Sequence, residues 1–294
     1  MNASLDARAV KDAQRATWDA LSAGWAEAQD VFERGASLVT RRLLDLGGVR
    51  PGQTVLDVGT GLGEPALTAA RRVGRTGRVV ATDVSPEMLR IARRRAAGLG
   101  EVEANVEFTQ ADVEAQGLRP GSFDVALSRW GLMFAVDHVA AFAGLRRLLK
   151  PGGVLAAAVW GPVGDAPVMA LGFASLSVLL DLPPVPPDTP GPFSMADPDV
   201  LTGELQAAGF SGVSVEELRV PFAFESVGAY AAFTRAVTPP LLLDRIRERY
   251  GSPDAREAWQ AVEAAAARFG TGSGGVHIPS KALCVRASNP GDGR

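Results

Sequence analysis

The sequence contains very little cysteine and histidine. Cys284 is the single cysteine among 294 residues, which excludes a disulfide framework and a cysteine-rich metal site and fits a reducing compartment. The two histidines, His138 and His277, would have to converge from distant parts of the chain to hold a zinc ion. We therefore expect no metal and no redox chemistry.

The chain also lacks a strong excess of either charge and any long apolar run. Thirty basic and thirty-three acidic side chains give a net charge of −3, which favours neither nucleic acid nor an anionic membrane as a partner. The longest uncharged run, residues 166–180, is shorter than the ~20 residues that a bilayer span needs. The charged start of the chain has no apolar signal core. We expect a cytoplasmic monomer or homodimer without integral membrane contact.

Apolar spacing and turn residues divide the chain into successive segments. Trp18, Leu21 and Trp25 recur at three- and four-residue spacing near the start, which predicts helix. Six prolines in residues 183–193 exclude a helix interior or a central strand there. The expected segments are a helical cap (1–50), an α/β core (51–160), a Pro-rich insertion (161–196), a core helix and strand (197–220), a helical lid (221–280) and a last core strand with its tail (281–294).

The core alternates short β-rich runs with amphipathic helices. This alternation implies parallel strands joined by right-handed crossovers, hence an α/β fold with a doubly wound sheet. The predicted core strands are 54–58, 78–82, 106–110, 123–128 and 154–160, and the predicted core helices are 64–73, 86–98 and 138–149. Beyond the core we expect a helix ending near Gly209 and strands at 211–220 and 281–287.

The most informative stretch is VLDVGTGLGE, residues 55–64, in which a strand runs through a glycine-rich turn into a helix. Ligands bind at such strand ends in open parallel sheets, and glycines let the backbone approach them. A pyrophosphate would sit on the helix N-terminus, where Asp57 and Glu64 would repel it. The G-x-G-x-G spacing also departs from the dinucleotide fingerprint. The turn therefore favours a cationic ligand without phosphate, such as an ammonium or sulfonium compound. The alternative is a dinucleotide ligand, which would make the protein an NAD(P)-dependent oxidoreductase.

Acidic residues also follow the next two strands. Asp83, 24 residues after Gly59, could accept both hydroxyls of a ribose. Asp112 is placed to accept from an adenine amino group, and the Val113 amide would face the ring. Each aspartate could instead be a helix cap or turn residue. Carboxylates at three successive strand ends favour a nucleoside ligand.

Five motifs resemble, in order, those of the class I S-adenosylmethionine-dependent methyltransferases, most of all the ubiquinone/menaquinone C-methyltransferase-like branch with its methyltransferase type 11 domain. The motifs span about residues 50–160 and read VLDVGTGLGEPAL, VVATDVSPEMLRIAR, ADVE, FDVALSRWGLMF and LRRLLKPGGVLAAAVW. The resemblance implies a Rossmann-like, seven-stranded sheet whose last strand, KALCVRA, is antiparallel. It also implies S-adenosyl-L-methionine as the cofactor and S-adenosyl-L-homocysteine as the product.

The same resemblance implies which residues hold each part of the cofactor. The glycines of the turn after the first strand would line the methionine part of the cofactor. Asp83 would hold the ribose, and Met88 would pack on the adenine. Ser128 would lie near the sulfonium, and Trp25 would close over the cofactor from the N-terminal helix. The full set of expected cofactor residues is Asp57, Gly59, Thr60, Gly61, Gly63, Asp83, Val84, Met88, Asp112, Val113, Ser128 and Trp25.

Apolar segments outside the core predict a lid over a hydrophobic acceptor, since such pockets are mostly apolar. Trp130, Met133 and Phe134 follow the fourth strand, where an acceptor would meet the methyl group. We expect methyl transfer, of a kind used in secondary metabolism, to carbon or oxygen of a small, largely apolar molecule: a quinol, a phenolic or polyketide-type metabolite, or an isoprenoid. A non-catalytic cofactor-binding module that engages a protein partner is the alternative from another class.

The sequence assigns no catalytic residue. A base is needed only if the acceptor carries a proton at the working pH, and histidine is the usual choice. His277, in the glycine-rich approach to the last strand, is a candidate that could face the pocket. His138 follows Asp137 at an expected helix start, a position more typical of the surface.

Overall fold

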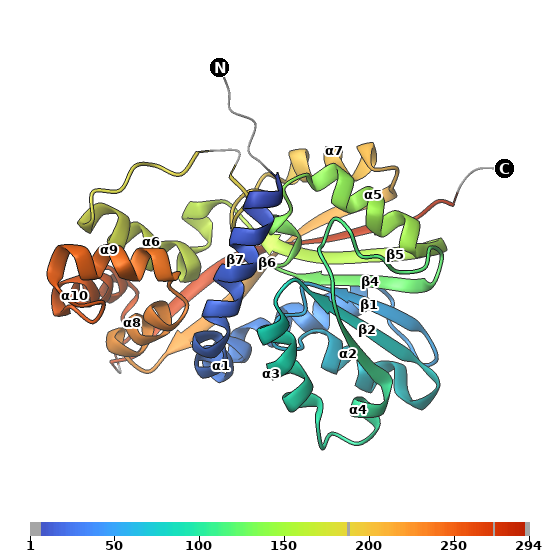
Figure 1. Ribbon diagram of the computed structural model, residues 1–294, viewed down its shortest axis with the longest axis horizontal. Coiled ribbons are helices and arrows are strands. Elements are labelled where there is room, and N and C mark those ends of the chain that lie inside the picture. The colour runs from blue at the N-terminus through green and yellow to red at the C-terminus, as the bar shows by residue number, and fades with distance from the viewer. Residues whose placement is uncertain (1–6, 187–188, 273, 292–294) are drawn as a thin grey trace.

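The computed structural model describes residues 7–186, 189–272 and 274–291. Within these residues the strands form one sheet in the order β3-β2-β1-β4-β5-β7-β6, in which β7 is antiparallel to both of its neighbours (Figure 1). The strands are β1 (Thr54–Val58), β2 (Arg78–Asp83), β3 (Val106–Gln110), β4 (Phe123–Arg129), β5 (Leu149–Trp160), β6 (Ser211–Phe224) and β7 (Val276–Ser288). The predicted Rossmann-like, doubly wound sheet with a last antiparallel strand is confirmed.

Helices flank this sheet and extend beyond it. They are α1 (Ala7–Leu46), α2 (Ala66–Val73), α3 (Pro86–Ala96), α4 (Glu101–Asn105), α5 (His138–Leu148), α6 (Pro167–Leu179), α7 (Pro198–Ala207), α8 (Val227–Ala236), α9 (Pro240–Tyr250) and α10 (Arg256–Ala266). The core helices begin where local signals place them. At α3, Pro86 occupies the first turn and the Ser85 hydroxyl accepts a hydrogen bond from the Met88 amide at 3.1 Å.

The N-terminal segment is one continuous helix of 40 residues, about 60 Å long at 1.5 Å per residue. Its buried face includes Phe32, Val39 and Leu43, which join the main hydrophobic core. Figure 1 shows α1 crossing in front of the sheet, between the fan of strands and the helical group α6, α8, α9 and α10. This crossing places α1 over the carboxyl ends of the central strands.

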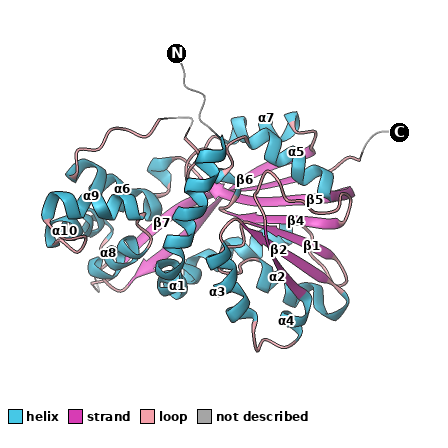
Figure 2. Cartoon of the chain, viewed as in Figure 1, coloured by secondary structure: helices cyan, strands magenta, loops and turns pink. Residues whose placement is uncertain are grey.

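The two last strands are longer than the alternating patterns predict. β6 continues to Phe224 and β7 begins at Val276, so the two strands pair well beyond the rest of the sheet. Figure 2 shows this two-stranded extension reaching into the helical group. The helices of the expected lid therefore occupy residues 227–266, and the ends of the 221–280 segment belong to the sheet.

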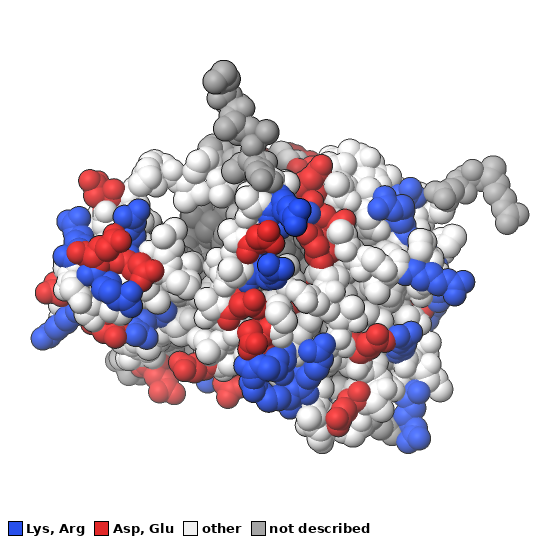
Figure 3. All heavy atoms as spheres, in the orientation of Figure 1, with Lys and Arg blue, Asp and Glu red and all other residues white. Residues whose placement is uncertain are grey.

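The insertion at 161–196 contains α6, an unexpected helix, because its residues are almost uniformly apolar and show no periodicity. The proline-rich stretch that follows is neither helix nor strand over its described residues, 183–186 and 189–193, as its prolines require. In the part of the chain that the structure describes, no helix has both the length and the apolar composition to cross a membrane. Lys and Arg side chains are interspersed with Asp and Glu on the face shown in Figure 3.

Candidate functional site

A cavity lies where the carboxyl ends of β1, β2, β3 and β4 meet α1. Its walls come from three sources, namely one side of α1, the turns that follow the strands, and the region after β5. Helix α1 contributes Lys11, Gln14, Trp18, Trp25, Gln29, Phe32 and Glu33. The strand ends, the turns after them and α3 contribute Val58, Gly59, Thr60, Gly61, Leu62, Glu64, Asp83, Val84, Met88, Arg95, Ala111, Asp112, Val113, Glu114, Arg129, Trp130, Gly131, Met133 and Phe134. The end of β5 contributes Trp160, and the region after β5 contributes Met169 and Pro192.

The glycine-rich turn after β1 needs two of its glycines for different reasons. Gly59 has φ +68°, and a Cβ on it would lie 3.0 Å from the Gly131 Cα, so only glycine allows the turns after β1 and β4 to approach. Gly61 has φ +54°, and a Cβ on it would meet no atom within 4 Å. The turn therefore presents bare backbone to the cavity.

Asp83 connects this turn to the end of β2. Its Oδ2 accepts a hydrogen bond from the Gly61 amide at 2.8 Å, and its Oδ1 accepts one from the Ser85 amide at 2.9 Å. Burial raises the pKa of Asp83 to about 6, although these amides act in the opposite direction. Asp83 thus holds the turn in shape while lining the cavity where a ribose is expected.

Asp57 supports the turn from behind and does not line the cavity. It is fully buried in β1, and its Oδ2 accepts a hydrogen bond from the Ala66 amide at the start of α2, at 2.9 Å. Burial raises the pKa of Asp57 to about 7, because it outweighs the Thr60 hydroxyl, the Ala66 amide and the positive charge of Arg129. The direct cofactor contact implied for Asp57 is therefore corrected to a supporting role.

The burial of the Asp57 carboxyl predicts how the free energy of unfolding changes with pH. Because the folded-state pKa of Asp57 lies well above the usual range of an aspartate, its protonated form favours folding, and this contribution is lost as pH rises through about 7. At ~1.4 kcal/mol per pKa unit, the free energy of unfolding of wild type should fall by roughly 4 kcal/mol relative to Asp57→Asn between pH 4 and pH 8. Urea unfolding of both proteins at several pH values measures this difference.

Asp124→Asn is the matched control because its pKa shifts the other way. Burial opposes ionisation of Asp124, but Lys150 and the Thr54 amide outweigh it and lower the pKa. Wild type should therefore lose stability relative to Asp124→Asn only on acidification. A wild-type-to-Asp57→Asn difference that does not change with pH would contradict the assignment.

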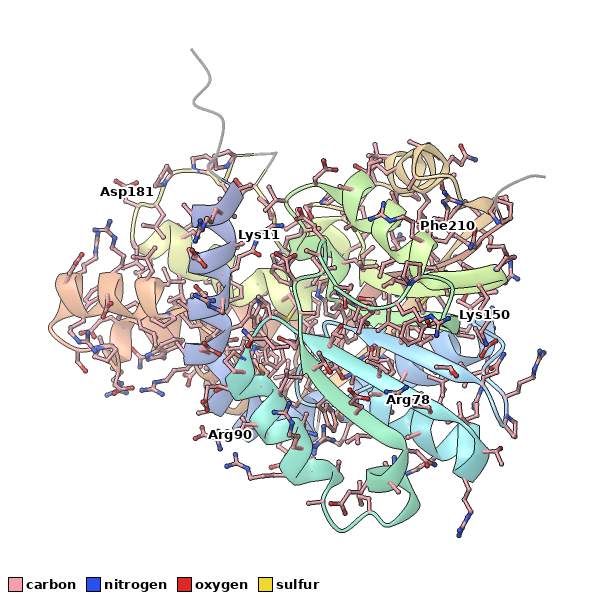
Figure 4. All side chains as sticks on the ribbon, turned by 45° about the vertical axis from the view of Figure 1, so that its right-hand side comes forward. Lys11, Arg78, Arg90, Lys150, Asp181 and Phe210 are labelled. Atoms are coloured by element: carbon pink, nitrogen blue, oxygen red, sulfur yellow. The ribbon has the colours of Figure 1, made fainter. Side chains whose placement is uncertain are left out.

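The adenine end of the cavity is closed by α1. Asp112 Oδ1 accepts a hydrogen bond from the Glu114 amide at 2.8 Å, and its Oδ2 lies 3.1 Å from Lys11 Nζ. Lys11, labelled near the upper end of α1 in Figure 4, also lies 2.9 Å from Glu114 Oε2. Met88 and Val113 line the same region. The structure thus brings the expected adenine residues together under a helix.

Further contacts hold α1 over the cavity. Gln14 Nε2 donates to the Phe134 carbonyl at 3.0 Å, and the Trp18 ring meets the Phe134 ring edge-on at 4.9 Å. Asp19 Oδ1 accepts from the Ser85 hydroxyl at 2.5 Å. Of the residues on this helix, only Trp25 is among the expected cofactor residues. The spacing of residues 11, 14, 18, 25, 29 and 32, which follows one helical face, is the signal that could have found the others.

An aromatic wall follows β4 at the expected acceptor end. Trp130 stacks on Trp160 with ring centroids 4.3 Å apart and planes 12° from parallel, and Phe32 meets it from α1 at 5.3 Å. Trp130 has φ +60°, an uncommon conformation for a bulky residue that is retained where surrounding structure imposes it. Met133 and Phe134 line the adjoining wall. All three expected acceptor residues therefore face the same cavity.

Arg129, next to this wall, ties α1 to the end of β4. Its guanidinium is almost fully buried and forms a two-pronged ion pair with Glu33 of α1, with Nη1 2.9 Å from Oε2. Nη1 also donates to the Thr40 hydroxyl at 2.8 Å. Arg129 was not among the expected site residues, because nothing in the local pattern separates it from an ordinary strand-end arginine.

Two other residues implied by the resemblance lie outside the cavity lining. The Ser128 hydroxyl donates to the Val58 carbonyl at 2.9 Å inside the sheet. At Gly63, with φ +105°, a Cβ would lie 3.1 Å from the Leu67 side chain, so this glycine serves packing of the turn on α2. Both contacts expected with the cofactor are corrected accordingly.

Neither histidine lines the cavity. His277 is exposed on β7 opposite Ala223, because alternation along the strand buries Val276 and turns the next side chain outward. The expectation that His277 faces the pocket is therefore wrong. His138 Nδ1 lies 3.1 Å from Glu204 Oε2, so it links α5 to α7. Among the described residues, no cluster of three or more His, Cys, Asp and Glu is placed to hold a metal ion.

The cavity fits S-adenosylmethionine, the cofactor that the motifs imply. Five carboxylates and three cationic side chains line it, a balance that suits a ligand with a sulfonium and an ammonium group. The glycine-rich turn adds bare backbone beside these charges, since a Cβ at Gly61 would meet no atom within 4 Å, so polar groups of the cofactor can approach the main chain there.

Comparison with known proteins agrees with this geometry. Residues 55–153 match the family model described as a methyltransferase domain. The chain is 39% identical over 127 residues to the ubiquinone/menaquinone biosynthesis C-methyltransferase UbiE of Enterobacter sp. (strain 638), an alignment covering 43% of this chain and 50% of the relative. The chain thus spans about half the length of the curated relatives it matches.

Solved structures show the same fold over most of the chain. A chain in the complex between the Haloferax volcanii Trm112 methyltransferase activator and the putative methyltransferase is 20% identical, with 95% of this chain and 99% of that chain covered and a TM-score of 0.58. A putative methyltransferase from Bacillus halodurans C-125 is 18% identical, with 86% and 99% covered and a TM-score of 0.54. The predicted resemblance is confirmed: residues 55–153 match a methyltransferase domain, and the chain is similar in sequence to the ubiquinone/menaquinone biosynthesis C-methyltransferases.

Proposed function

We propose that the protein transfers the methyl group of S-adenosylmethionine to carbon or oxygen of a small, largely apolar acceptor with a flat ring. The observation that carries this proposal is the stacked pair Trp130 and Trp160, which shares one cavity with Asp83 and Asp112. Aromatic faces of this kind bind planar rings by offset stacking. The curated relatives are named for C-methylation in ubiquinone and menaquinone biosynthesis, which makes a quinol-like ring the acceptor class we favour.

Different residues along the cavity would hold different parts of the cofactor and the acceptor. Asp83 and the glycine-rich turn would hold the ribose and methionine parts, while Met88, Asp112 and Val113 would hold the adenine. When bound, S-adenosylmethionine supplies an electrophilic methyl group on its sulfonium. Trp130 and the adjoining wall would orient the acceptor, and α1 would keep water out. Orientation and water exclusion can supply on the order of 7–11 kcal/mol of acceleration without a protein base.

The alternatives have less support. Glu64 lines the cavity at the turn, where a dinucleotide would place its pyrophosphate, so an NAD(P)-dependent oxidoreductase is disfavoured. A non-catalytic module that engages a protein partner leaves the aromatic wall unexplained. A cytoplasmic location, a role in secondary metabolism, and a monomeric or homodimeric state stay predictions.

Methyl-labelled S-adenosylmethionine and an extract of the source organism test the proposal. After incubation with the protein, label should move into an organic phase, where mass analysis identifies the product. Trp130→Ala should transfer label at least about tenfold more slowly while binding S-adenosylhomocysteine within about twofold of wild type, because it removes the acceptor wall alone. His277→Ala, the exposed control, should transfer label at the wild-type rate.

Two results would contradict the proposal. Label confined to the aqueous phase would mean a polar acceptor. Equal transfer by wild type and Trp130→Ala would mean that the acceptor does not use the aromatic wall.

A further inference from the structure

Two opposite charges line the same end of the cavity without neutralising each other. Arg95 lies in the last turn of α3, and Glu64 follows the glycine-rich turn. Among the described residues, no carboxylate lies within 4 Å of the Arg95 guanidinium nitrogens and no cationic group lies within 4 Å of the Glu64 carboxylate. The Arg95 guanidinium reaches the Leu62 carbonyl, two residues before Glu64 in the turn.

Arg95 is held in place by neutral groups only. Its guanidinium donates to the Leu62 carbonyl, and the Gln29 amide oxygen, oriented toward it, accepts from Nε at 2.7 Å and Nη1 at 2.9 Å. Burial lowers the pKa of Arg95, and the more distant carboxylates of Glu64 and Glu33 offset this in part. A partly buried guanidinium without an anionic partner is costly in isolation, and an anionic ligand group would complete its surroundings.

Glu64 shows the complementary arrangement. Its Oε2 accepts a hydrogen bond from the Thr68 hydroxyl at 2.7 Å, which fixes the carboxylate without neutralising it. The neighbouring carboxylates are committed elsewhere, because Glu33 is paired with Arg129 and Asp57 lies behind the turn. Glu64 is therefore the carboxylate left to receive a cationic group at this end.

We propose that Arg95 and Glu64 together form a receptor for a zwitterion, the α-carboxylate and α-ammonium of the cofactor's methionine part. The inference rests on the proposed function, since it requires the cofactor to bind in this cavity. Arg95 binds the carboxylate while Gln29 of α1 holds its guanidinium in position. Glu64 binds the ammonium. One turn of α3, the start of α2 and the covering helix α1 thus select the amino-acid end of the ligand.

Titration calorimetry with two nucleosides tests this receptor directly. S-Adenosylhomocysteine carries the amino-acid group, whereas 5′-deoxy-5′-methylthioadenosine has the same adenosine and sulfur without it. Wild type should bind S-adenosylhomocysteine at least about tenfold more tightly. Arg95→Gln should weaken S-adenosylhomocysteine at least about tenfold, since it removes a charge-assisted contact, and should leave methylthioadenosine within about twofold. Glu64→Gln should show the same selective loss.

Control variants separate a ligand contact from a structural role. Arg94→Gln, on the exposed side of the same helical turn, should bind both nucleosides as wild type does. Arg95→Lys keeps the charge but not the planar fork and should recover part of the lost selectivity. Equal weakening of both nucleosides by Arg95→Gln, or unchanged binding of both, would overturn the inference. Failure of wild type to bind either nucleoside would instead overturn the proposed function.

Discussion

Replacing Asp83 by alanine should weaken binding of S-adenosylhomocysteine by at least about 100-fold. The substitution removes the acceptor for the Gly61 and Ser85 amides, so the glycine-rich turn loses its attachment to β2. It also removes the carboxylate expected to hold the ribose. Hydrogen bonds to a charged group contribute ~1.5–3 kcal/mol each, and losing two of them is sufficient for this effect. Titration calorimetry measures the affinity, and circular dichroism checks that the variant is folded.

A conservative variant and a surface control make the Asp83 result specific. Asp83→Asn keeps one acceptor oxygen and should lose affinity to an intermediate degree. Glu107→Gln removes an exposed carboxylate that pairs with Arg78 on the neighbouring strand and should bind normally. An Asp83→Ala protein that is folded and binds within threefold of wild type would show that this carboxylate neither shapes the turn nor holds the ligand.

Arg129→Met should lower the free energy of unfolding by about 3 kcal/mol. The substitution leaves Glu33 without its partner and removes the hydrogen bond to Thr40, two of the contacts that hold α1 across the end of β4. Breaking a buried ion pair by removing one member typically costs ~3–5 kcal/mol because the remaining charge is uncompensated. The Glu33 side chain keeps 24% exposure, which places the expected loss at the lower end. Urea denaturation measures it.

The double variant Arg129→Met with Glu33→Leu tests the cause of that loss. Removing both charges eliminates the uncompensated carboxylate, so the double variant should be more stable than Arg129→Met alone by at least about 1 kcal/mol. A double variant less stable than either single variant would show that packing, not charge pairing, determines the effect.

The core of the fold was predictable from the sequence because its signals are local. β1 and β4 are short β-rich segments that are buried along most of their length, as strands covered on both faces are, and Ser85 with Pro86 marks the start of α3. Glycine-rich turns and successive aspartates then indicate the ligand-binding edge of the sheet. These features depend on residues close together in sequence, so a single chain is enough to recognise them.

The parts that sequence analysis missed depend on contacts between distant residues. Gln14 contacts Phe134 and Arg129 contacts Glu33, and the members of each pair lie about one hundred residues apart in the sequence. No local sequence pattern therefore predicts either pair. The extension of β6 and β7 packs against α1 through Phe222 and Phe32 and against the helical group through Phe224 and Tyr230, and alternation alone does not locate its end. His277 shows the same limit, because its orientation depends on the register of β7.

The position of a residue in a motif predicts that the residue lies near the cavity more reliably than it predicts which atoms the residue contacts. Three motif residues lie beside the cavity but contact other parts of the protein. Asp57 accepts a hydrogen bond from the first amide of α2, Gly63 packs on Leu67, and Ser128 donates to the Val58 carbonyl. Conversely, Arg95 lines the cavity together with Glu64, although the motifs imply no role for Arg95. Which side of a turn a side chain faces is determined by packing, and the structure is needed to read it.

Direct binding of S-adenosylhomocysteine to the wild-type protein, compared with NADH under the same conditions, tests the central claim most directly. The geometry of Asp83, Asp112 and the glycine-rich turn predicts saturable one-to-one calorimetric binding of S-adenosylhomocysteine and no measurable binding of NADH. Binding of NADH without binding of S-adenosylhomocysteine would contradict the account, because the cavity would then accept the pyrophosphate that Glu64 is expected to repel.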